Sequence, residues 1–280
     1  MRNLLTIIFA VATTALLAQP ELPQPSPTAT ISQKVGLADV SITYSRPGVK
    51  GRTIFGDLVP YDKIWRTGAN KATAITLGTD ATIGGKEVSA GSYSIFTIPG
   101  KDEWTIIINS ETELWGAGNY DEAKDVARFK VKPGKLAEKV ESFTIDFGSF
   151  TDEGCNINMS WENTKVSFPL GVDAVAQAMA NIEKEIAAVE GSWRVYVRSA
   201  QYMARTGKDL DKALEYTEMA LAMKEYWWTY WVQAEVYAAK KDYKSAIKSM
   251  KKSIKLGEEI EGWSYKERLE KLLAEYEAEA

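Results

Sequence analysis

The sequence contains no histidine and only one cysteine, and both shortages restrict the chemistry available to it. Without histidine there is no histidine general base, no histidine-based catalytic triad and no histidine ligand for zinc. The single cysteine, Cys155, excludes a disulfide within the chain and a thiolate metal cluster. Any reaction must therefore use carboxylates, Lys, Arg, Tyr, Ser or Thr, and neither a metal nor a cofactor is predicted.

Blocks of like charge are also absent. The chain carries 34 Lys and Arg against 38 Asp and Glu, a formal net charge of −4, and the two signs are interspersed. A mildly acidic chain without a basic run argues against nucleic acid as a partner. Hydrophobic and charged fractions of 45% and 26% are ordinary globular values, and 280 residues suffice for one or two well-buried domains.

The first 18 residues resemble a secretory signal peptide. Arg2 supplies the positive start, an apolar stretch interrupted by threonines follows, and the small residues Ala15 and Ala18 precede the expected cleavage point. We expect an exported protein, periplasmic or secreted, with a membrane anchor as the alternative. No second run of about 18 apolar residues occurs, so no transmembrane segment is expected in the mature chain. Residues 19–27 form a proline-rich, extended lead.

Residues 28–170 alternate between apolar and polar positions with a period of two, which is typical of strands with one solvated face. The Gly84-Gly85 pair predicts a tight hairpin. Many short strands with Gly/Pro turns and no helices between them predict an antiparallel β-sandwich or a flattened barrel. Cys155 is in phase with Ile157 and is interpreted as a small buried hydrophobic residue. The apolar residues at alternate positions, which are expected on the inward faces of the strands, are Val40, Ile42, Tyr44, Ala127, Phe129, Val131, Phe143, Ile145, Phe147, Ile157, Met159, Trp161, Val166 and Phe168.

Residues 171–280 lack proline and carry helical periodicity. A first helix is expected from Val172 through Val189, ending near Gly191. Further on, the segment 209–214 repeats as 242–247, with Ala213 and Ala246 at an offset of 33 residues. Such a repeat resembles tetratricopeptide helical hairpins. Because about three repeats are needed for stability, the first helix and a last helix near 265–279 are expected to act as caps. The predicted fold class is α+β, with two domains.

The stretch from Tyr44 to Asn70 is the main candidate site. Glycines and prolines break its alternation, which indicates a loop system held on a rigid scaffold. Guanidinium groups suit carboxylates, phosphates and sugar hydroxyls, and an indole offers a stacking face. Alternatively, the arginines satisfy carbonyls or pair with Asp57 and Asp62, and the tryptophan fills the core. The candidate ligand-binding residues are Arg46, Arg52, Trp65, Arg66 and Asn70. Trp104 and Trp115 are expected to line the same site.

The same stretch carries a family resemblance. The strings SRP at 45–47, GR-IFG-LVP from 51 to 60 and WRTGAN at 65–70 resemble the domain of unknown function 2911 family. Further similar strings are IGGK at 83–86, AGSYSIFTIP at 90–99, EWTIIIN at 103–109 and WG at 115–116. The resemblance covers roughly residues 25–170 and implies an exported bacterial protein with a domain boundary there. It implies no reaction and no catalytic residues.

Two further sets of side chains in this domain are weaker candidates. Sandwich and barrel folds host glycosidases that use two carboxylates, and several are available, although no spacing singles out a pair. Asp and Asn side chains between Asn109 and Asp125 could supply oxygens to calcium, but acids do not stand at alternate positions there. The available carboxylates are Asp57, Asp62, Glu103, Glu111 and Glu113.

The helical region contains an aromatic stripe between Tyr226 and Tyr237. Trp227, Trp228 and Trp231 cannot all point the same way at 100° per residue, so at least one is expected on a surface, where it could hold a peptide or protein. Burial between repeats is the alternative.

Three function classes follow. The first is a non-catalytic binding protein, with an anionic or sugar-like ligand in the sandwich and a protein partner on the helices. The second is a carboxylate-dependent hydrolase acting on a glycan or ester. The third is a structural adaptor that binds only through its helical domain.

Overall fold

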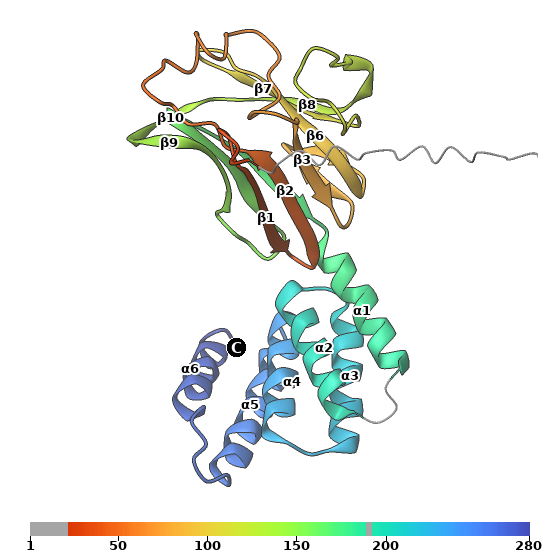
Figure 1. The fold of residues 1–280 in the computed structure, drawn as a ribbon. Helices are drawn as coiled ribbons and strands as arrows, with labels where there is room; N and C mark the ends of the chain where they lie inside the picture. The colour runs from red at the N-terminus through yellow and green to blue at the C-terminus, as the bar shows by residue number, and fades with distance from the viewer. Residues whose placement is uncertain (1–21, 189–191) are drawn as a thin grey trace, which may run out of the picture. The chain divides into compact units, whose positions relative to one another are not determined.

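The computed structural model describes residues 22–188 and 192–280. The predicted signal peptide and Val189 lie outside these residues. The described chain divides into two compact units, one built of strands and one of helices (Figure 1). The main boundary falls between Leu170 and Gly171, and two turn segments of the strand region, Lys34–Asp39 and Phe150–Cys155, group with the helices.

Two sheets form the first unit, and every strand pair with a defined register is antiparallel. The six-stranded sheet has the order β1 (Thr28–Val35), β2 (Ala38–Ser45), β3 (Thr73–Leu77), β6 (Gly91–Ile98), β7 (Trp104–Asn109) and β8 (Asp125–Val131). The four-stranded sheet has the order β5 (Lys86–Val88), β4 (Ala81–Ile83), β10 (Gly154–Val172) and β9 (Gly134–Gly148). The predicted antiparallel sandwich is confirmed, and within the described residues the sheets do not close into a barrel.

The alternation in the sequence matches the burial of the strands. Val40, Ile42 and Tyr44 of β2 are buried, whereas Thr43 between them is exposed. The Gly84-Gly85 pair forms the expected hairpin between β4 and β5, with both glycines at positive φ, a conformation that costs glycine little. Cys155 is buried, and this burial raises the pKa of its thiol.

An aromatic cluster fills the space between the sheets. The indoles of Trp65 and Trp161 stack with ring centroids 5.9 Å apart and an interplanar angle of 16°. Phe55, Trp104 and Phe143 close around this pair in edge-on contacts with centroids 4.9–6.4 Å apart. Offset and edge-on aromatic pairs add roughly 0.5–1.5 kcal/mol each beyond burial. This cluster forms the centre of the sandwich core.

The hydroxyl of Tyr44 joins the two sheets by hydrogen bonds. It donates to the carbonyl oxygen of Ile145 at 3.1 Å and accepts the Ile145 main-chain N–H at 3.0 Å. Tyr44 lies on β2 of one sheet and Ile145 on β9 of the other, and both are buried. One side chain therefore satisfies two buried main-chain groups that would otherwise lack partners.

Six helices form the second unit (Figure 1). They are α1 (Ala174–Ala188), α2 (Trp193–Thr206), α3 (Leu210–Met223), α4 (Trp227–Ala239), α5 (Tyr243–Glu258) and α6 (Lys266–Ala278). Asp209 caps α3 by accepting the Lys212 N–H, and Asp242 caps α5 by accepting the Ser245 N–H. Ala213 and Ala246 are fully buried. Repeated caps and repeated small residues confirm the tetratricopeptide-like description.

The helices pack around two hydrophobic clusters. One gathers Val197, Met203 and Val232 with Ala213, and the other gathers Trp227, Trp231, Met250 and Leu269. At the end of α5 a β-carbon on Gly257 would stand 2.2 Å from the Trp263 ring, so the indole occupies that space. None of the helices in the described part of the chain is long and apolar enough to cross a membrane.

We predict that Tyr44→Phe destabilises the sandwich by about 1–3 kcal/mol, because the ring stays while two buried groups of Ile145 lose their partner. Urea unfolding followed by near-ultraviolet circular dichroism measures the change. Tyr93→Phe is the matched control, since its hydroxyl donates to the Ser89 carbonyl at the surface. Equal losses in the two variants would contradict a special role for the Tyr44 bridge.

Candidate functional site

Two of the three arginines in the Tyr44–Asn70 stretch are engaged with main-chain carbonyls. Arg46 donates from Nε to Phe143 O at 3.1 Å and from Nη2 to the Thr144 hydroxyl at 2.8 Å. Arg52 donates from Nε to Val49 O at 3.1 Å and from Nη2 to Gly48 O at 2.6 Å. These contacts hold the loops in place and match the carbonyl-satisfying alternative for these two residues. No ion pair joins either guanidinium to an acid in the described residues.

Trp65 and Trp104 are brought together, but inside the core. Trp65 is 7% exposed and Trp104 is 3% exposed, and their ring centroids lie 6.4 Å apart. The Trp65 indole N–H donates to the carbonyl of Gly68 at 3.1 Å. Its main chain pairs with Thr97 of β6 in both directions, at 2.7 and 2.9 Å. Neither ring has an open face for a ligand, so stacking by these two residues is not available in this conformation.

The side chain of Asn70 also forms hydrogen bonds within the protein. Its side-chain amide donates to the Ser26 carbonyl and to the Ser45 hydroxyl, both at 3.3 Å. Its φ of 57° is a left-handed conformation that asparagine tolerates better than most residues. The amide ties the end of β2 at Ser45 to the end of the WRTGAN string.

Arg66 and Trp115 differ from the other predicted ligand residues. The Nε of Arg66 is buried, and no hydrogen bond or ion pair to its guanidinium exists among the described residues. Burial lowers the pKa of Arg66. Trp115 is 78% exposed, and its main chain bridges to Lys71, whose ammonium pairs with Glu113 at 2.9 Å. Ligand binding by this group as a whole stays a prediction.

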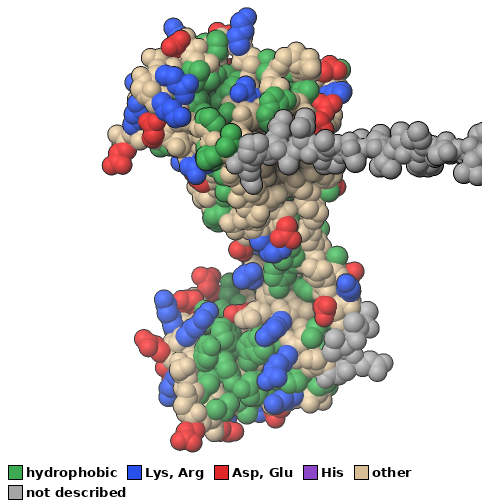
Figure 2. Space-filling model, in the orientation of Figure 1, with side chains coloured by type: hydrophobic (Ala, Val, Ile, Leu, Met, Phe, Trp, Pro, Cys, Tyr) green, Lys and Arg blue, Asp and Glu red, His purple; other side chains and the backbone are tan. Residues whose placement is uncertain are grey.

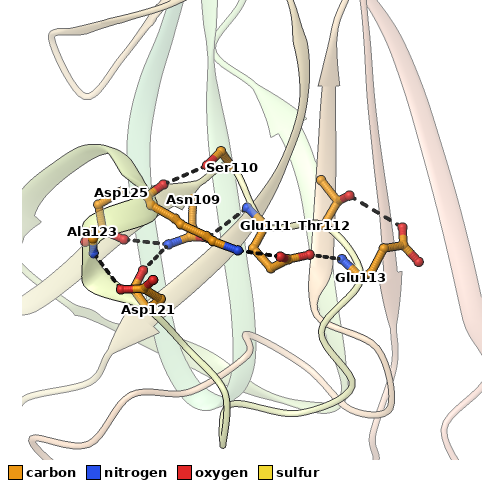
Figure 3. A network of polar contacts seen from close by, with 9 residues as sticks. Asn109, Ser110, Glu111, Thr112, Glu113, Asp121, Ala123 and Asp125 are labelled. Atoms are coloured by element: carbon orange, nitrogen blue, oxygen red, sulfur yellow. Dashed lines mark hydrogen bonds and ion pairs between the residues drawn. The ribbon is translucent and has the colours of Figure 1, made fainter.

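The acids and amides of the loop between β7 and β8 bond to one another (Figure 3). The side-chain amide of buried Asn109 donates to Asp125 Oδ1 at 2.8 Å and to the Asp121 carbonyl at 2.9 Å. Lys124 pairs with Glu111 at 2.8 Å, and this hydrogen bond lowers the pKa of Glu111. The side chains of Asn109, Asp121 and Asp125, which could have supplied oxygens to calcium, therefore accept hydrogen bonds locally. The described residues contain no metal-binding group of three or more acids, cysteines or histidines.

The other candidate carboxylates are paired with lysines or exposed to solvent. Glu103 forms an ion pair with Lys130 at 2.6 Å, and Glu113 with Lys71. Asp57 and Asp62 are exposed. Tyr120 donates to Asp125 Oδ2 at 2.7 Å, and burial followed by this bond raises the pKa of Tyr120 to about 12.

The tryptophans of α4 are mostly internal. Trp227 is 8% and Trp231 is 5% exposed, and their rings stack with centroids 6.0 Å apart. Trp228 is partly buried, with its ring 6.1 Å from that of Trp193. Thus Trp228 is the member of the three that keeps more exposed surface, and the other two pack between helices. Protein binding by this stripe stays a prediction.

A groove of about 520 Å³ lies in the helical unit, and no sequence pattern had indicated it. Three helices, α2, α4 and α6, contribute its lining: Arg198, Gln201, Tyr202, Ala204, Arg205, Glu235, Arg268 and Tyr276. On the face of this unit drawn in Figure 2, Lys and Arg side chains border a hydrophobic area. The groove thus combines three guanidinium groups with one carboxylate and two phenol rings.

Two of the three groove arginines lie over aromatic rings, and few acidic groups neutralise their charge. The Arg268 guanidinium lies 5.0 Å from the Trp231 ring centroid, and that of Arg205 lies 5.6 Å from the Tyr202 ring. Arg205 reaches only exposed Asp152, at 3.8 Å, and Arg198 has no ion pair among the described residues. Stacked guanidiniums keep their hydrogen-bonding edges free.

Among the described residues that line the groove, Glu235 is the only acid. Gln201 donates to its Oε2 at 3.1 Å. Burial raises the pKa of Glu235, and the interactions with Gln201, Trp231 and Arg268 lower it in part. The Trp231 indole N–H faces the carboxylate without hydrogen-bond geometry.

One signal in the sequence could have revealed part of the groove. Gln201 and Glu235 lie 34 positions apart, close to the repeat offset of 33, and Arg198, Tyr202 and Arg205 share one face of α2 by their spacing. The sequence could not predict that Arg268 and Tyr276 line the same groove, because that depends on how α6 packs against the other helices.

Comparisons with known proteins gave one match. A family model described as "Protein of unknown function (DUF2911)" matches residues 26–170. Neither the search of curated proteins nor the search of solved structures gave a match. The matched residues cover the sandwich, so the groove between α2, α4 and α6 lies outside them.

We predict that Trp65→Ala destabilises the sandwich by about 3–5 kcal/mol, because it leaves a cavity at the centre of the aromatic cluster. Trp115→Ala, which removes an exposed indole, should change stability by no more than about 0.5 kcal/mol. Urea unfolding of both variants tests this. An unchanged stability of Trp65→Ala would contradict its role at the centre of the core.

For Glu235, a raised folded pKa means that the native state holds the proton more tightly than the unfolded chain. Its stabilising contribution is complete below the unfolded pKa and is lost as pH rises through the folded pKa. Glu235→Gln should therefore gain stability relative to the parent protein as pH rises from about 4.5 to 7. Thermal unfolding across this range measures the difference, and a constant offset would contradict the prediction.

Proposed function

The chain belongs to the DUF2911 family of proteins of unknown function, and from its own geometry we propose that it is an exported, non-catalytic interaction protein. In this proposal the helical unit holds an extended, carboxylate-bearing segment of a partner protein in the groove between α2, α4 and α6. The sandwich serves as a rigid platform. Export rests on the signal-like first 18 residues.

The observation that carries this proposal is the excess of cations in the groove. Three arginines face one carboxylate, and two of the arginines stack on aromatic rings. A guanidinium offers a planar fork that binds a carboxylate through two parallel hydrogen bonds. Acidic side chains or a chain terminus would supply the missing negative charge. Tyr202 and Tyr276 add flat walls against which apolar parts of a peptide can lie.

A hydrolase is the weaker proposal. Glycoside hydrolysis requires two carboxyl groups about 5–10 Å apart, one of them free to act as an acid. Glu235 stands alone in the groove lining, and the acids of the loop between β7 and β8 are bonded to Asn109 and Lys124. Neither place supports a two-carboxylate mechanism.

The sandwich contributes less to binding in this proposal than its arginine-rich sequence suggests. Arg46 and Arg52 are used by carbonyls, and Trp65 and Trp104 are buried. This distribution favours the adaptor hypothesis over a ligand site built from the whole stretch. Arg66, whose Nε has no partner in the described part of the chain, and exposed Trp115 remain for an anionic or sugar-like ligand there.

The test is fluorescence anisotropy with a labelled glutamate-rich peptide at low salt, compared with glutamine-rich and lysine-rich peptides of equal length. The acidic peptide should bind most tightly of the three, and its affinity should fall as the salt concentration rises. The triple variant R198A/R205A/R268A should lose at least tenfold in affinity, about 1.4 kcal/mol. Arg194→Ala is the matched control, since Arg194 lies on α2, is exposed and does not line the groove.

Two results would overturn the proposal. One is equal binding of the acidic and glutamine-rich peptides, and the other is an unchanged affinity in the triple variant. Circular dichroism of each variant confirms that the helices are retained.

A further inference from the structure

A second pocket lies in the helical unit and shares no lining residue with the arginine groove. Its volume is about 660 Å³, which is within the range of small-molecule sites. Residues of α4 and α5 line it, and the six that matter here are Tyr230, Gln233, Tyr237, Lys248, Ser249 and Lys255. We call it the lysine pocket.

Four lysines of α5 line this pocket, and two of them have no counter-ion among the residues that the structure describes. Lys251 pairs with Glu277 at 2.7 Å, and Lys252 pairs with Glu225 at 3.0 Å. Lys248 and Lys255 form no ion pair and no hydrogen bond within the described residues. They lie seven positions apart, hence on the same face of the helix. The pocket therefore carries a local positive charge although the chain as a whole is acidic.

Buried polar groups form part of the lining. The Ser249 hydroxyl donates to Gln233 Oε1 at 2.9 Å, and Gln233 Nε2 donates to the Thr217 hydroxyl at 3.4 Å. This chain fixes the orientation of the Gln233 amide, because its oxygen accepts from one side and its nitrogen donates on the other. One amide N–H of Gln233 and the lone pairs of Ser249 keep hydrogen-bonding capacity.

Two tyrosines complete the lining. Tyr230 donates to Glu225 at 3.0 Å, and the Lys252 ammonium lies 5.7 Å from its ring centroid. Tyr237 is half-buried, and its hydroxyl has no hydrogen-bond partner in the described part of the chain. Phenol rings provide flat apolar faces with a polar edge.

We propose that the lysine pocket binds an acidic sugar, that is, one saccharide ring carrying a carboxylate or a phosphate. Lys248 and Lys255 neutralise the acidic group. Gln233, Ser249 and the Tyr237 hydroxyl hydrogen-bond to ring hydroxyls, and a tyrosine ring covers the C–H face of the sugar. This inference is independent of the peptide proposed for the arginine groove, because the two sites share no side chain.

The chemistry of the lining favours a sugar over an acidic peptide. A peptide-only site needs no buried amide–hydroxyl chain, whereas a polyhydroxylated ring needs several oriented donors and acceptors. Lysines act as point charges and accept either a carboxylate or a phosphate, so the identity of the acidic group is left to the test.

The test is isothermal titration of the purified protein with galacturonate, glucose 6-phosphate, galactose, glucose and inorganic phosphate. At least one of the two acidic sugars should bind at least tenfold more tightly than its neutral parent sugar. Inorganic phosphate alone should bind more weakly than the acidic sugar. If phosphate binds as well as the sugars, the pocket is not a sugar site and the proposal fails.

Matched variants locate the binding. Lys248→Ala and Lys255→Ala should each weaken acidic-sugar binding about tenfold. Lys244→Ala is the control, because Lys244 is exposed on the same helix but does not line the pocket. Tyr237→Phe should weaken binding less than Tyr237→Ala, since the ring face remains. Equal effects of Lys244→Ala and Lys248→Ala would place binding outside the pocket and overturn the proposal, as would retained binding in the K248A/K255A double variant.

Discussion

The first unit depends on the two-way main-chain pairing between Trp65 and Thr97. Hydrogen bonds of 2.7 and 2.9 Å attach an irregular segment to β6, and this fixes the indole between the two sheets. Once Trp65 lies there, it stacks on Trp161 and contacts Phe143, so a loop residue joins the centre of the core. Arg52 then satisfies two carbonyls of this loop, and Arg46 and Asn70 attach the loop to β9 and to the end of β2.

This arrangement explains why a cationic, aromatic loop need not be a binding surface. A long segment without regular strands leaves many carbonyls without partners, and arginine reaches two of them with one side chain. Arg52 does this for Val49 and Gly48, whereas Arg46 attaches the loop to β9 through the Phe143 carbonyl and the Thr144 hydroxyl. Arg66 differs because its Nε is buried without such a partner, so the three arginines do not have one common role.

Local periodicity was sufficient to predict much of the fold. Val40, Ile42 and Tyr44 indicated a strand face, Gly84-Gly85 indicated a hairpin, and Ala213 with Ala246 indicated repeated helical pairs. The candidate sites were harder to predict from the sequence, because the orientation of Trp65 depends on Trp161, almost 100 positions away. Likewise the groove requires Arg198, Glu235 and Arg268 to converge from three helices, and no spacing within one helix encodes that convergence.

The contact of Trp263 with Gly257 has a consequence for how this chain can vary through evolution. A glycine inside a helix costs up to about 1 kcal/mol relative to alanine, so drift alone would tend to replace it. Here the indole fills the position of the missing methyl group. Orthologues that retain this large ring should keep the glycine, and those that exchange the glycine should carry a smaller residue in place of the ring. The two positions are thus expected to change together.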